Sequence, residues 1–307
     1  MSRVEEALRR AGTASAPERQ ADLSADVRGF EQFPHERADG PRAPRHEPAV
    51  AVARNTPPAT ILSPRSLAPE AFGGISQDVE GKIVIDGEVA ETSIEQYNRL
   101  ATSLHLIQTH TGLRTLMISS ALPRDGKTLT AANLALTLSE SYKRHVLLID
   151  ADLRRPSVHE VFRVPNASGL ADCLRGDGAI SVPFIQVSPY LTILPSGPTD
   201  ETPMAGLASA RLQALLKNVK TRFDWVIVDT PPVGIISDAS ILASQLDGVL
   251  LVIGAGATPY EAVKRAVTEF GKDRIVGVVL NRVSAQTIHD KSYAQHYGRR
   301  QAGGDVR

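Results

Sequence analysis

Residues 116–128 read Leu-Met-Ile-Ser-Ser-Ala-Leu-Pro-Arg-Asp-Gly-Lys-Thr, and this stretch decides the fold. It opens with an apolar run of strand length, continues through a loop that ends in Gly-Lys-Thr, and leads into a helical pattern that begins near Leu129. A loop between a strand and a helix N-terminus turns successive backbone N–H groups inward, and these donors and the helix dipole together hold a polyphosphate. The stretch therefore matches a phosphate-binding loop, with Ala121 in the place of the usual first glycine.

The chain on both sides of this loop alternates short apolar runs with helical stretches. The expected strands are 116–119, 146–149, 191–194, 225–228, 249–253 and 275–280, and the expected helices include 129–141, 208–222 and 260–271. Strands that are apolar almost throughout are buried on both faces, and alternation with helices implies parallel pairing through right-handed crossovers. We therefore expect a three-layer α/β domain with a mainly parallel sheet, whose ligands bind beyond the carboxyl ends of the strands.

Composition excludes several classes of protein. The 307 residues carry 34 Lys and Arg against 34 Asp and Glu, so no overall basic excess favours nucleic-acid binding. The single cysteine, Cys173, rules out an internal disulfide and fits a reducing compartment. The first residues lack the apolar core of a secretory signal, and no apolar run approaches the length of a membrane span. We expect a cytoplasmic protein that would reach the inner membrane only peripherally, through a partner.

Residues 1–75 have the composition of a linker. Nine prolines interrupt every potential helix, and arginines alternate with acids, so this stretch cannot bury enough apolar surface to offset its ordering entropy. We predict a disordered Pro/Arg-rich region. Residues 2–11 are the exception, because Ser2 and Glu5 have the form of a capping box. This segment is either a docking helix or a frayed end.

Three strand ends supply the groups that a Mg–nucleotide site needs. In the loop, Lys127 would reach the β- and γ-phosphates and the Thr128 hydroxyl would ligate Mg²⁺. The second strand ends in Asp150 and Asp152, which project the same way, and a later strand ends in Asp229. Taken singly, these acids have ordinary explanations: Asp152 could cap the following helix, Asp150 could pair with a basic residue, and Asp229 could be an unremarkable acid at a strand end. Because the fold brings the strand ends together, the combination favours a nucleotide site.

The motifs LPRDGKT (122–128), LLIDADLR (147–154) and VIVDTPP (226–232) resemble the Walker A, Walker A′ and Walker B motifs of bacterial tyrosine kinases. These are the autokinases of capsule and exopolysaccharide synthesis, here in the cytoplasmic form without a fused membrane segment. The resemblance covers about residues 80–298. It implies a P-loop NTPase fold of the deviant Walker A kind over residues 76–290, with ATP and Mg²⁺ as cofactors. The implied reaction transfers phosphate from ATP to protein tyrosine, yielding ADP and phosphotyrosine.

The resemblance also assigns roles to residues. The implied nucleotide-binding set is Arg124, Asp125, Gly126, Lys127, Thr128, Leu129 and Asn281, the last of which would read the adenine edge. The implied catalytic set is Lys127, Asp150, Asp152 and Asp229, and the implied metal set is Thr128, Asp150 and Asp229. Asp152 would take the proton from the attacking tyrosine hydroxyl. Arg124 departs from the family, which has glycine there, and its side chain would crowd the loop or add a cation beside the phosphates.

A flexible tail, residues 291–307, holds the expected phosphoacceptors Tyr293 and Tyr297 where relatives have a longer run of tyrosines. The other explanation is that both are ordinary residues of a polar tail. The resemblance implies self-association for phosphorylation in trans and activation by a membrane polysaccharide co-polymerase. The family's Glu-x-x-Arg-x-x-Arg ring-assembly motif keeps Glu95, but Asn98 and Ala101 replace its arginines.

Two alternatives stay open. The first is a partitioning or positioning ATPase of the same deviant P-loop type, although such proteins have a second lysine where this chain has Leu122. The second is a non-catalytic, nucleotide-sensing regulator of a polysaccharide assembly complex, which Arg124 and the two-tyrosine tail would suit.

Overall fold

The computed structural model describes residues 72–79, 81–85, 89–175, 180–199, 204–233 and 238–283. The predictions for residues 1–71, including the helix at 2–11, and for the tail at 291–307 lie outside these described residues. The boundary at residue 75 stays a prediction, although Phe72 and Ile75 already pack against a buried core cluster.

A seven-stranded sheet forms the centre of the fold. Its strands are β1 (Thr115–Ser120), β2 (Val146–Asp150), β3 (Ile185–Gln186), β4 (Leu191–Leu194), β5 (Trp225–Asp229), β6 (Gly248–Gly254) and β7 (Ile275–Asn281). They lie in the order β3-β4-β2-β5-β1-β6-β7. Every neighbouring pair is parallel except β3 and β4. The mainly parallel sheet predicted from the apolar runs is confirmed, and all six expected strands are present.

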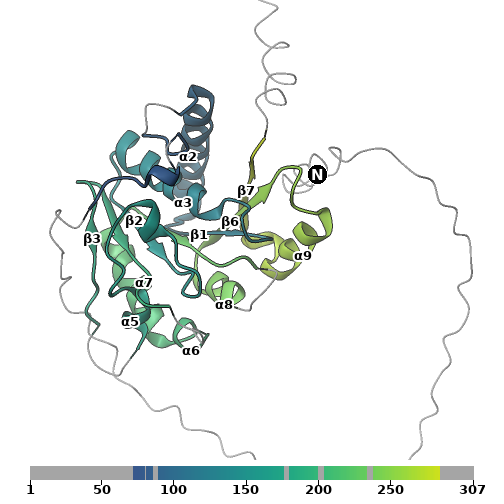
Figure 1. Ribbon diagram of the computed structural model, residues 1–307. Helices are drawn as coiled ribbons and strands as arrows, with labels where there is room; N and C mark the ends of the chain where they lie inside the picture. Colours follow the sequence, from purple (N-terminus) through teal and green to yellow (C-terminus); the bar gives the residue numbers. More distant parts are fainter. Residues whose placement is uncertain are drawn as a thin grey trace, which may run out of the picture. The chain divides into compact units, whose positions relative to one another are not determined.

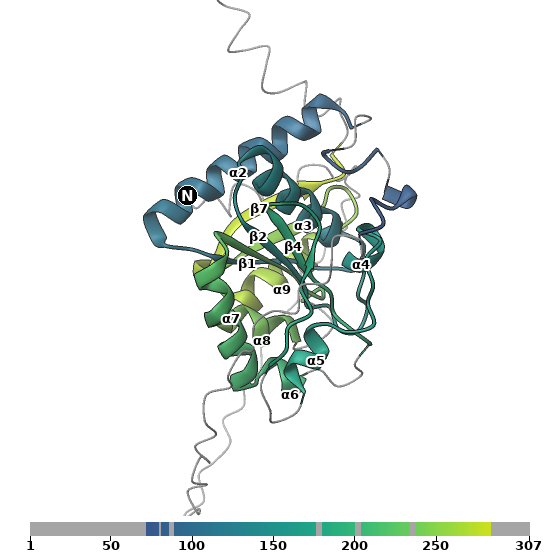
Figure 2. The ribbon, with the colours of Figure 1, turned by 90° about the vertical axis from the view of Figure 1, so that its left-hand side faces the viewer.

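Helices cover both faces of the sheet, as Figures 1 and 2 show. The helices of eight or more residues are α2 (Glu91–Thr111), α3 (Lys127–Leu136), α7 (Ala210–Arg222), α8 (Asp238–Gln245) and α9 (Tyr260–Phe270). The short ones are α4 (Val158–Val161), α5 (Leu170–Leu174) and α6 (Met204–Leu207). Residues of α2, α3 and α4 belong to one buried cluster, and residues of α5, α7, α8 and α9 belong to the other. This is the expected three-layer arrangement.

The strands alternate between the two cores residue by residue. In β1, Leu116 and Ile118 pack toward α2 and α3, whereas Met117 packs toward the opposite layer. All six residues of β1 are buried, because both faces of a central parallel strand are covered. Burial on both faces explains why the sequence shows continuous apolar runs here instead of a strict alternation with polar residues.

Two features of the helices differ from the sequence expectation. The helix expected at 129–141 starts at Lys127, because Gly126 adopts a left-handed backbone that ends the loop, and its last turn, Thr137–Ser141, is a π-helix. The helix expected at 208–222 begins at Ala210, because the Ser209 hydroxyl accepts a hydrogen bond from Leu212 N and caps it. The edge strand β3 and helices α2, α4, α5, α6 and α8 were not anticipated.

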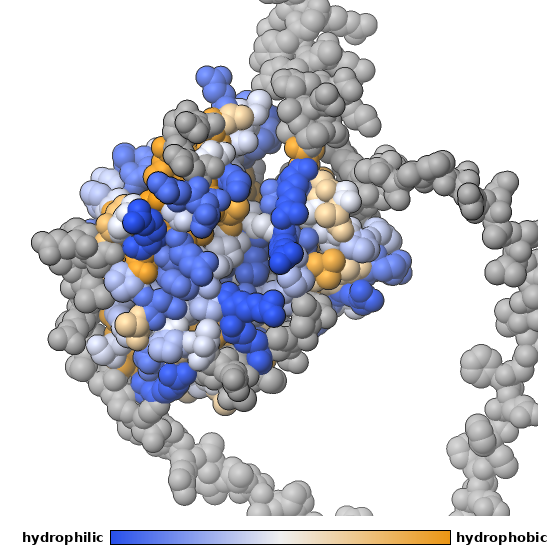
Figure 3. Space-filling view, viewed as in Figure 1, coloured by the Kyte–Doolittle hydropathy of each residue, from blue (hydrophilic) through white to orange (hydrophobic). Residues whose placement is uncertain are grey.

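The surface view in Figure 3 shows apolar residues scattered singly among hydrophilic ones. Within the described ranges, the exposed large hydrophobic residues are Ile85, Leu106 and Tyr260. No helix in this part of the chain combines the length and the apolar character needed to cross a bilayer.

Candidate functional site

Three adjacent strands bring the three motifs together. β5 lies between β1 and β2, and Asp229 of β5 is in register with Asp150 of β2 and with Ile118 of β1. The phosphate-binding loop follows β1 and leads into α3 at Lys127. Parallel strands present their carboxyl ends at one edge of the sheet, so the loop and both strand-terminal acids meet there.

The loop backbone is shaped by two residues with positive φ. Arg124 has φ 68° and Gly126 has φ 99°, and a Cβ added to Gly126 would lie 1.9 Å from Asn281 Nδ2. Residue 126 must therefore be glycine for both conformational and steric reasons. Arg124 adopts the left-handed conformation without being a glycine, and its side chain is exposed, so it does not crowd the interior of the loop.

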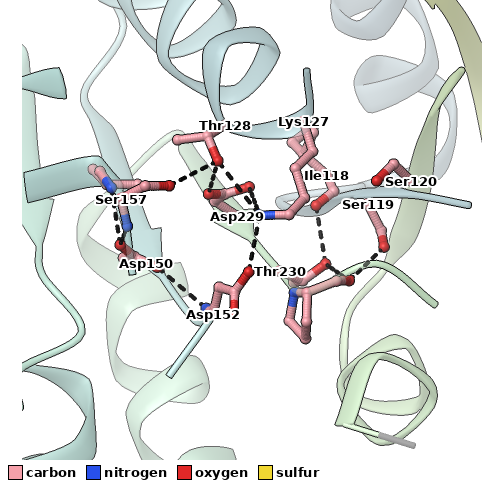
Figure 4. A network of polar contacts seen from close by, with 12 residues as sticks. Ile118, Ser119, Ser120, Lys127, Thr128, Asp150, Asp152, Ser157, Asp229 and Thr230 are labelled. Atoms are coloured by element: carbon pink, nitrogen blue, oxygen red, sulfur yellow. Dashed lines mark hydrogen bonds and ion pairs between the residues drawn. The ribbon is translucent and has the colours of Figure 1, made fainter. Parts of the chain in front are cut away.

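Lys127 and Thr128 both contact Asp229, as Figure 4 shows. Lys127 Nζ donates to Asp152 Oδ2 at 3.0 Å and lies 3.8 Å from Asp229 Oδ1. The Thr128 hydroxyl donates to Asp229 Oδ2 at 2.7 Å and shares a 3.1 Å hydrogen bond with the Ser157 hydroxyl. One lysine therefore bridges the acids that follow β2 and β5.

Asp150 is held by backbone donors. Its Oδ2 accepts hydrogen bonds from the amides of Ser157 and Val158, each at 3.0 Å, and its Oδ1 accepts from Asp152 N at 3.2 Å. Asp152 in turn accepts from Arg155 N at 3.1 Å through Oδ1, while Oδ2 faces Lys127. Asp150 therefore fixes the turn that presents Asp152 to the lysine. The ordinary explanations left open by the sequence were a helix cap at Asp152 and an ion pair at Asp150; in the structure Asp152 pairs with Lys127, and Asp150 accepts from the amides at the start of α4.

Burial dominates the electrostatics of the two strand-terminal acids. Both Asp150 and Asp229 have no exposed surface. Burial, followed by the charge of Asp229, raises the pKa of Asp150 to about 8. Burial also raises the pKa of Asp229, against the opposing charge of Lys127. Burial alone would lower the pKa of Lys127, but the charges of Asp229 and Asp152 outweigh it, so that pKa lies above its ordinary value. Lys127 therefore stays a cation.

The remaining residues of the implied nucleotide-binding set are Asp125, Asn281 and Leu129. Asp125 is buried, accepting from Leu122 N at 3.0 Å and from the Thr258 hydroxyl at 2.7 Å, so it shapes the loop from within. Asn281 donates from Nδ2 to the carbonyl of Asp125 at 2.9 Å. In this arrangement Asn281 contacts the loop itself, and its reading of adenine stays a prediction. Leu129 is half-buried and packs against the α2–α3 core.

Sequence reasoning missed two participants. Ser157 links Thr128 to the Asp150 turn. Arg154 donates from Nε to the buried Asp238 at 2.7 Å and so ties the Walker A′ segment to the start of α8. A serine following Pro156 at a helix start was a signal for Ser157, whereas no local pattern pairs Arg154 with a residue 84 positions away.

The segment compared with the family's ring-assembly motif lies on α2. Glu95 and Arg99 form an ion pair one turn apart on an exposed face. Ala101, at the place of the family's second arginine, is fully buried in the core. The tail tyrosines Tyr293 and Tyr297 lie outside the described residues.

The donor set fits a magnesium ion. The Thr128 hydroxyl and the Asp229 carboxylate are the hard oxygen ligands that Mg²⁺ prefers, and Asp229 Oδ1 is buried with no hydrogen-bond donor. In the part of the chain that the structure describes, no three acids, histidines or cysteines group closely enough to hold a metal by themselves. Mg²⁺ commonly binds one or two protein ligands and completes its coordination shell with phosphates and water.

Comparisons with known proteins agree with this geometry. Residues 124–270 match a family model described as AAA domain. The chain is 34% identical over 207 residues to the tyrosine-protein kinase YwqD of Bacillus subtilis, covering 66% of this chain and 86% of that protein. It is 30% identical to the tyrosine-protein kinase CpsD of Streptococcus agalactiae, covering 71% of this chain and 96% of that one.

A solved structure shows the same relationship. The kinase domain of the Escherichia coli tyrosine kinase ETK is 31% identical, with a TM-score of 0.56, over 62% of this chain and 77% of that one. A Salmonella typhimurium relative, the tyrosine-protein kinase wzc, is 30% identical over 73% of this chain but only 31% of its own length. The sequence identity, the shared fold and the phosphate-binding loop agree, so the chain belongs to the bacterial tyrosine-protein kinases, a family of nucleotide-using P-loop proteins.

Proposed function

We propose that this chain is an ATP- and Mg²⁺-dependent protein-tyrosine autokinase that regulates exopolysaccharide or capsule polymerisation and export. One observation carries the proposal. Lys127, Thr128, Asp152 and Asp229 follow three strand ends and form one chain of contacts: Lys127 lies within 4 Å of Asp152 and of Asp229, and Thr128 donates to Asp229 at 2.7 Å. That set supplies a phosphate cation, metal ligands and a base within one site.

Each residue has a task that its surroundings suit. Lys127, kept cationic by the neighbouring acids, would bind the β- and γ-phosphates together with the loop amides. Thr128 and Asp229 would hold Mg²⁺, and Asp150 would orient water in its shell. Bound Mg²⁺ would neutralise charge on the transferring phosphoryl group. Asp152, only 4% exposed and 3.0 Å from Lys127, would accept the proton of the phenol.

The tail tyrosines Tyr293 and Tyr297 would be the acceptors, each entering the site of a neighbouring copy. The family resemblance supports a membrane co-polymerase as the activator, which would bring the chain to the inner membrane and gather copies for phosphorylation in trans. Placing the acceptors on a second copy makes the reaction depend on protein concentration.

Phosphosite mapping of the full chain tests the proposal. The protein is incubated with ATP and Mg²⁺, with and without the cytoplasmic tail of a candidate co-polymerase, and phosphotyrosine is located by mass spectrometry. We expect phosphate on Tyr293 or Tyr297. The double variant Tyr293→Phe/Tyr297→Phe should lose it, and Tyr260→Phe, at an exposed tyrosine on α9, should keep it.

Two outcomes would contradict the proposal. Absence of phosphotyrosine with the co-polymerase tail present would count against kinase activity. If the protein still bound the nucleotide, this result would favour the nucleotide-sensing regulator. Rapid ATP hydrolysis without phosphotyrosine would favour the partitioning type of ATPase.

A further inference from the structure

The end of β7 holds the outer side of the phosphate-binding loop. Asn281 Nδ2 donates to the carbonyl of Asp125 at 2.9 Å, and Arg282 Nη2 donates to the carbonyl of Arg124 at 2.6 Å. Two consecutive side chains therefore bind two consecutive loop carbonyls. We call this pair of contacts the β7 clamp. The sequence and the family resemblance give Arg282 no role.

The loop conformation explains why its carbonyls need donors. Positive φ angles at Arg124 and Gly126, with Asp125 between them, form the kind of backbone concavity in which successive N–H groups point to one side. The carbonyls of the same peptides then point away from the phosphate side. An arginine in the left-handed region is disfavoured by its Cβ, unlike the glycine at residue 126. Contacts from outside the loop must therefore hold Arg124 in this conformation.

The clamp is anchored to the sheet. Asn281 Oδ1 accepts a hydrogen bond from Arg282 N at 2.9 Å, and the Asn281 carbonyl accepts from Ala255 N, after β6, at 2.8 Å. The close approach of Asn281 to Gly126 leaves no space for a Cβ there. Arg282 itself has φ 60°, in the left-handed region that is unfavourable for residues other than glycine. One hydrogen bond therefore joins two such residues, Arg124 and Arg282. Strain of this kind persists where the surrounding structure fixes it, commonly at ligand sites.

We propose that Arg282 is a positioning residue for nucleotide binding, which with Asn281 holds Arg124 in the left-handed conformation and so keeps the loop amides directed at the phosphates. The inference rests on the proposed nucleotide role of the loop. Arg282 acts through the Arg124 carbonyl and not by touching the nucleotide.

A double-mutant cycle tests the proposal, because glycine adopts the left-handed conformation without help. The variants are Arg282→Ala, Arg124→Gly and the two combined. In the wild-type background, Arg282→Ala should weaken binding of a fluorescent ATP analogue about tenfold, the typical effect of losing one charge-assisted hydrogen bond. In the Arg124→Gly background, the same change should weaken binding less than about threefold.

Hydrogen exchange supplies a readout that needs no nucleotide. In the ligand-free full chain, the amides of residues 121–128 should exchange faster in Arg282→Ala than in the wild type, and Arg282→Lys should restore part of the protection. Arg274→Ala is the matched control. Arg274 also donates to a backbone carbonyl at 2.6 Å, that of Ala243, and it lies at the opposite end of β7. This control should change neither exchange in the loop nor nucleotide affinity.

Several results would overturn the inference. One is that Arg282→Ala weakens nucleotide binding by the same factor in the wild-type background and in the Arg124→Gly background. Another is that loop exchange in Arg282→Ala matches that in Arg274→Ala. If the wild type bound no nucleotide although Arg282→Ala speeded loop exchange, the proposed function would fail while the clamp on Arg124 would stand.

Discussion

Asp229 ends β5 at the carboxyl edge of the sheet, whereas Asp247 precedes β6 at the amino edge, and their surroundings differ. Asp247 Oδ2 accepts from the amides of Arg114 and Thr115, each at 2.9 Å, and its Oδ1 accepts from Lys220 Nζ at 2.7 Å. Asp229 accepts one hydroxyl through Oδ2, while its Oδ1 is buried without a hydrogen-bond donor. The amino-edge acid completes its hydrogen bonds within the fold, and the carboxyl-edge acid does not.

The pKa directions follow the same division. Burial alone would raise the pKa of Asp247, but Lys220 and the amides of Thr115 and Arg114 outweigh it, so the pKa lies below its ordinary value. Burial raises the pKa of Asp229 and of Asp150 despite Lys127. Ionised Asp247 at the amino edge stabilises the fold, whereas ionised Asp150 and Asp229 at the carboxyl edge cost folding stability that a bound cation would return.

The largest expected difference is between variants of the two lysines that pair with these acids, Lys127 and Lys220. Lys127→Met should lower autophosphorylation by roughly 10²- to 10³-fold, because it removes the fixed positive charge at the transferring phosphoryl group. Lys220→Met removes the 2.7 Å ion pair with Asp247 at the amino edge, which is more exposed than the pair of Lys127 with Asp229, and it should leave the rate unchanged. The measurement is phosphotyrosine formed per unit time at saturating ATP. Equal losses in both variants would mean that the carboxyl edge has no special role.

Asp229→Asn should have the next largest effect. The asparagine amide keeps an acceptor for the Thr128 hydroxyl but no longer offers a carboxylate to the metal. Activity should therefore fall about 10- to 100-fold, in line with the loss of metal-site groups. Raising the Mg²⁺ concentration should recover part of the rate. Thermal unfolding at neutral pH should show no loss of stability, because the variant removes a buried charge. A clear drop in melting temperature would show that Asp229 serves the fold instead.

The general arrangement of this site could be predicted from sequence because its groups follow strand ends. Asp150 and Asp229 end apolar runs, Asp152 follows two residues later, and Lys127 and Thr128 follow the loop after another run; the parallel fold brings such positions to one edge. The sheet was predictable for a similar reason, since burial on both faces gives uninterrupted apolar runs. Local pattern and global fold agree at these residues.

What the sequence did not reveal depends on long-range contacts. Arg282 meets Arg124 across 158 positions, and Arg154 meets Asp238 across 84. Neither pair has a local signal, because each is fixed by strand order and not by periodicity. The two-residue strand β3 was also missed, since its antiparallel pairing with β4 depends on a tertiary contact and not on an apolar run.

The acids at the carboxyl edge should give the folded protein an unusual dependence on pH. The pKa of Asp150 is about 8 in the fold against an ordinary value of 3.8, so between these values the folded state binds more protons than the unfolded state. The free energy of unfolding should therefore fall, by at least about 1 kcal/mol, as the pH rises from 5 to 8. Urea titrations in EDTA without nucleotide measure this.

Asp229→Asn provides the control for that profile. The charge of Asp229 is the second cause of the raised pKa of Asp150, so its removal should make the pH dependence shallower over the same range. An identical slope in both proteins would show that other groups set the profile.

Asp247→Asn should have the smallest effect and the opposite sign with pH. Because the pKa of Asp247 is lowered in the fold, its contribution is present above the ordinary value of 3.8 and is lost as the pH falls through the folded value. An asparagine would turn an NH₂ group toward the donors of Arg114, Thr115 or Lys220, so the variant should lose about 1 kcal/mol of stability at pH 7. This difference from the wild type should shrink below about pH 4, and Asp273→Asn, at an exposed acid, should show none.

A loss that stayed constant down to low pH would mean that the shape of the Asp247 side chain, and not its charge, stabilises the amino edge. In that case the two edges would differ in their packing and not in how their charges are satisfied.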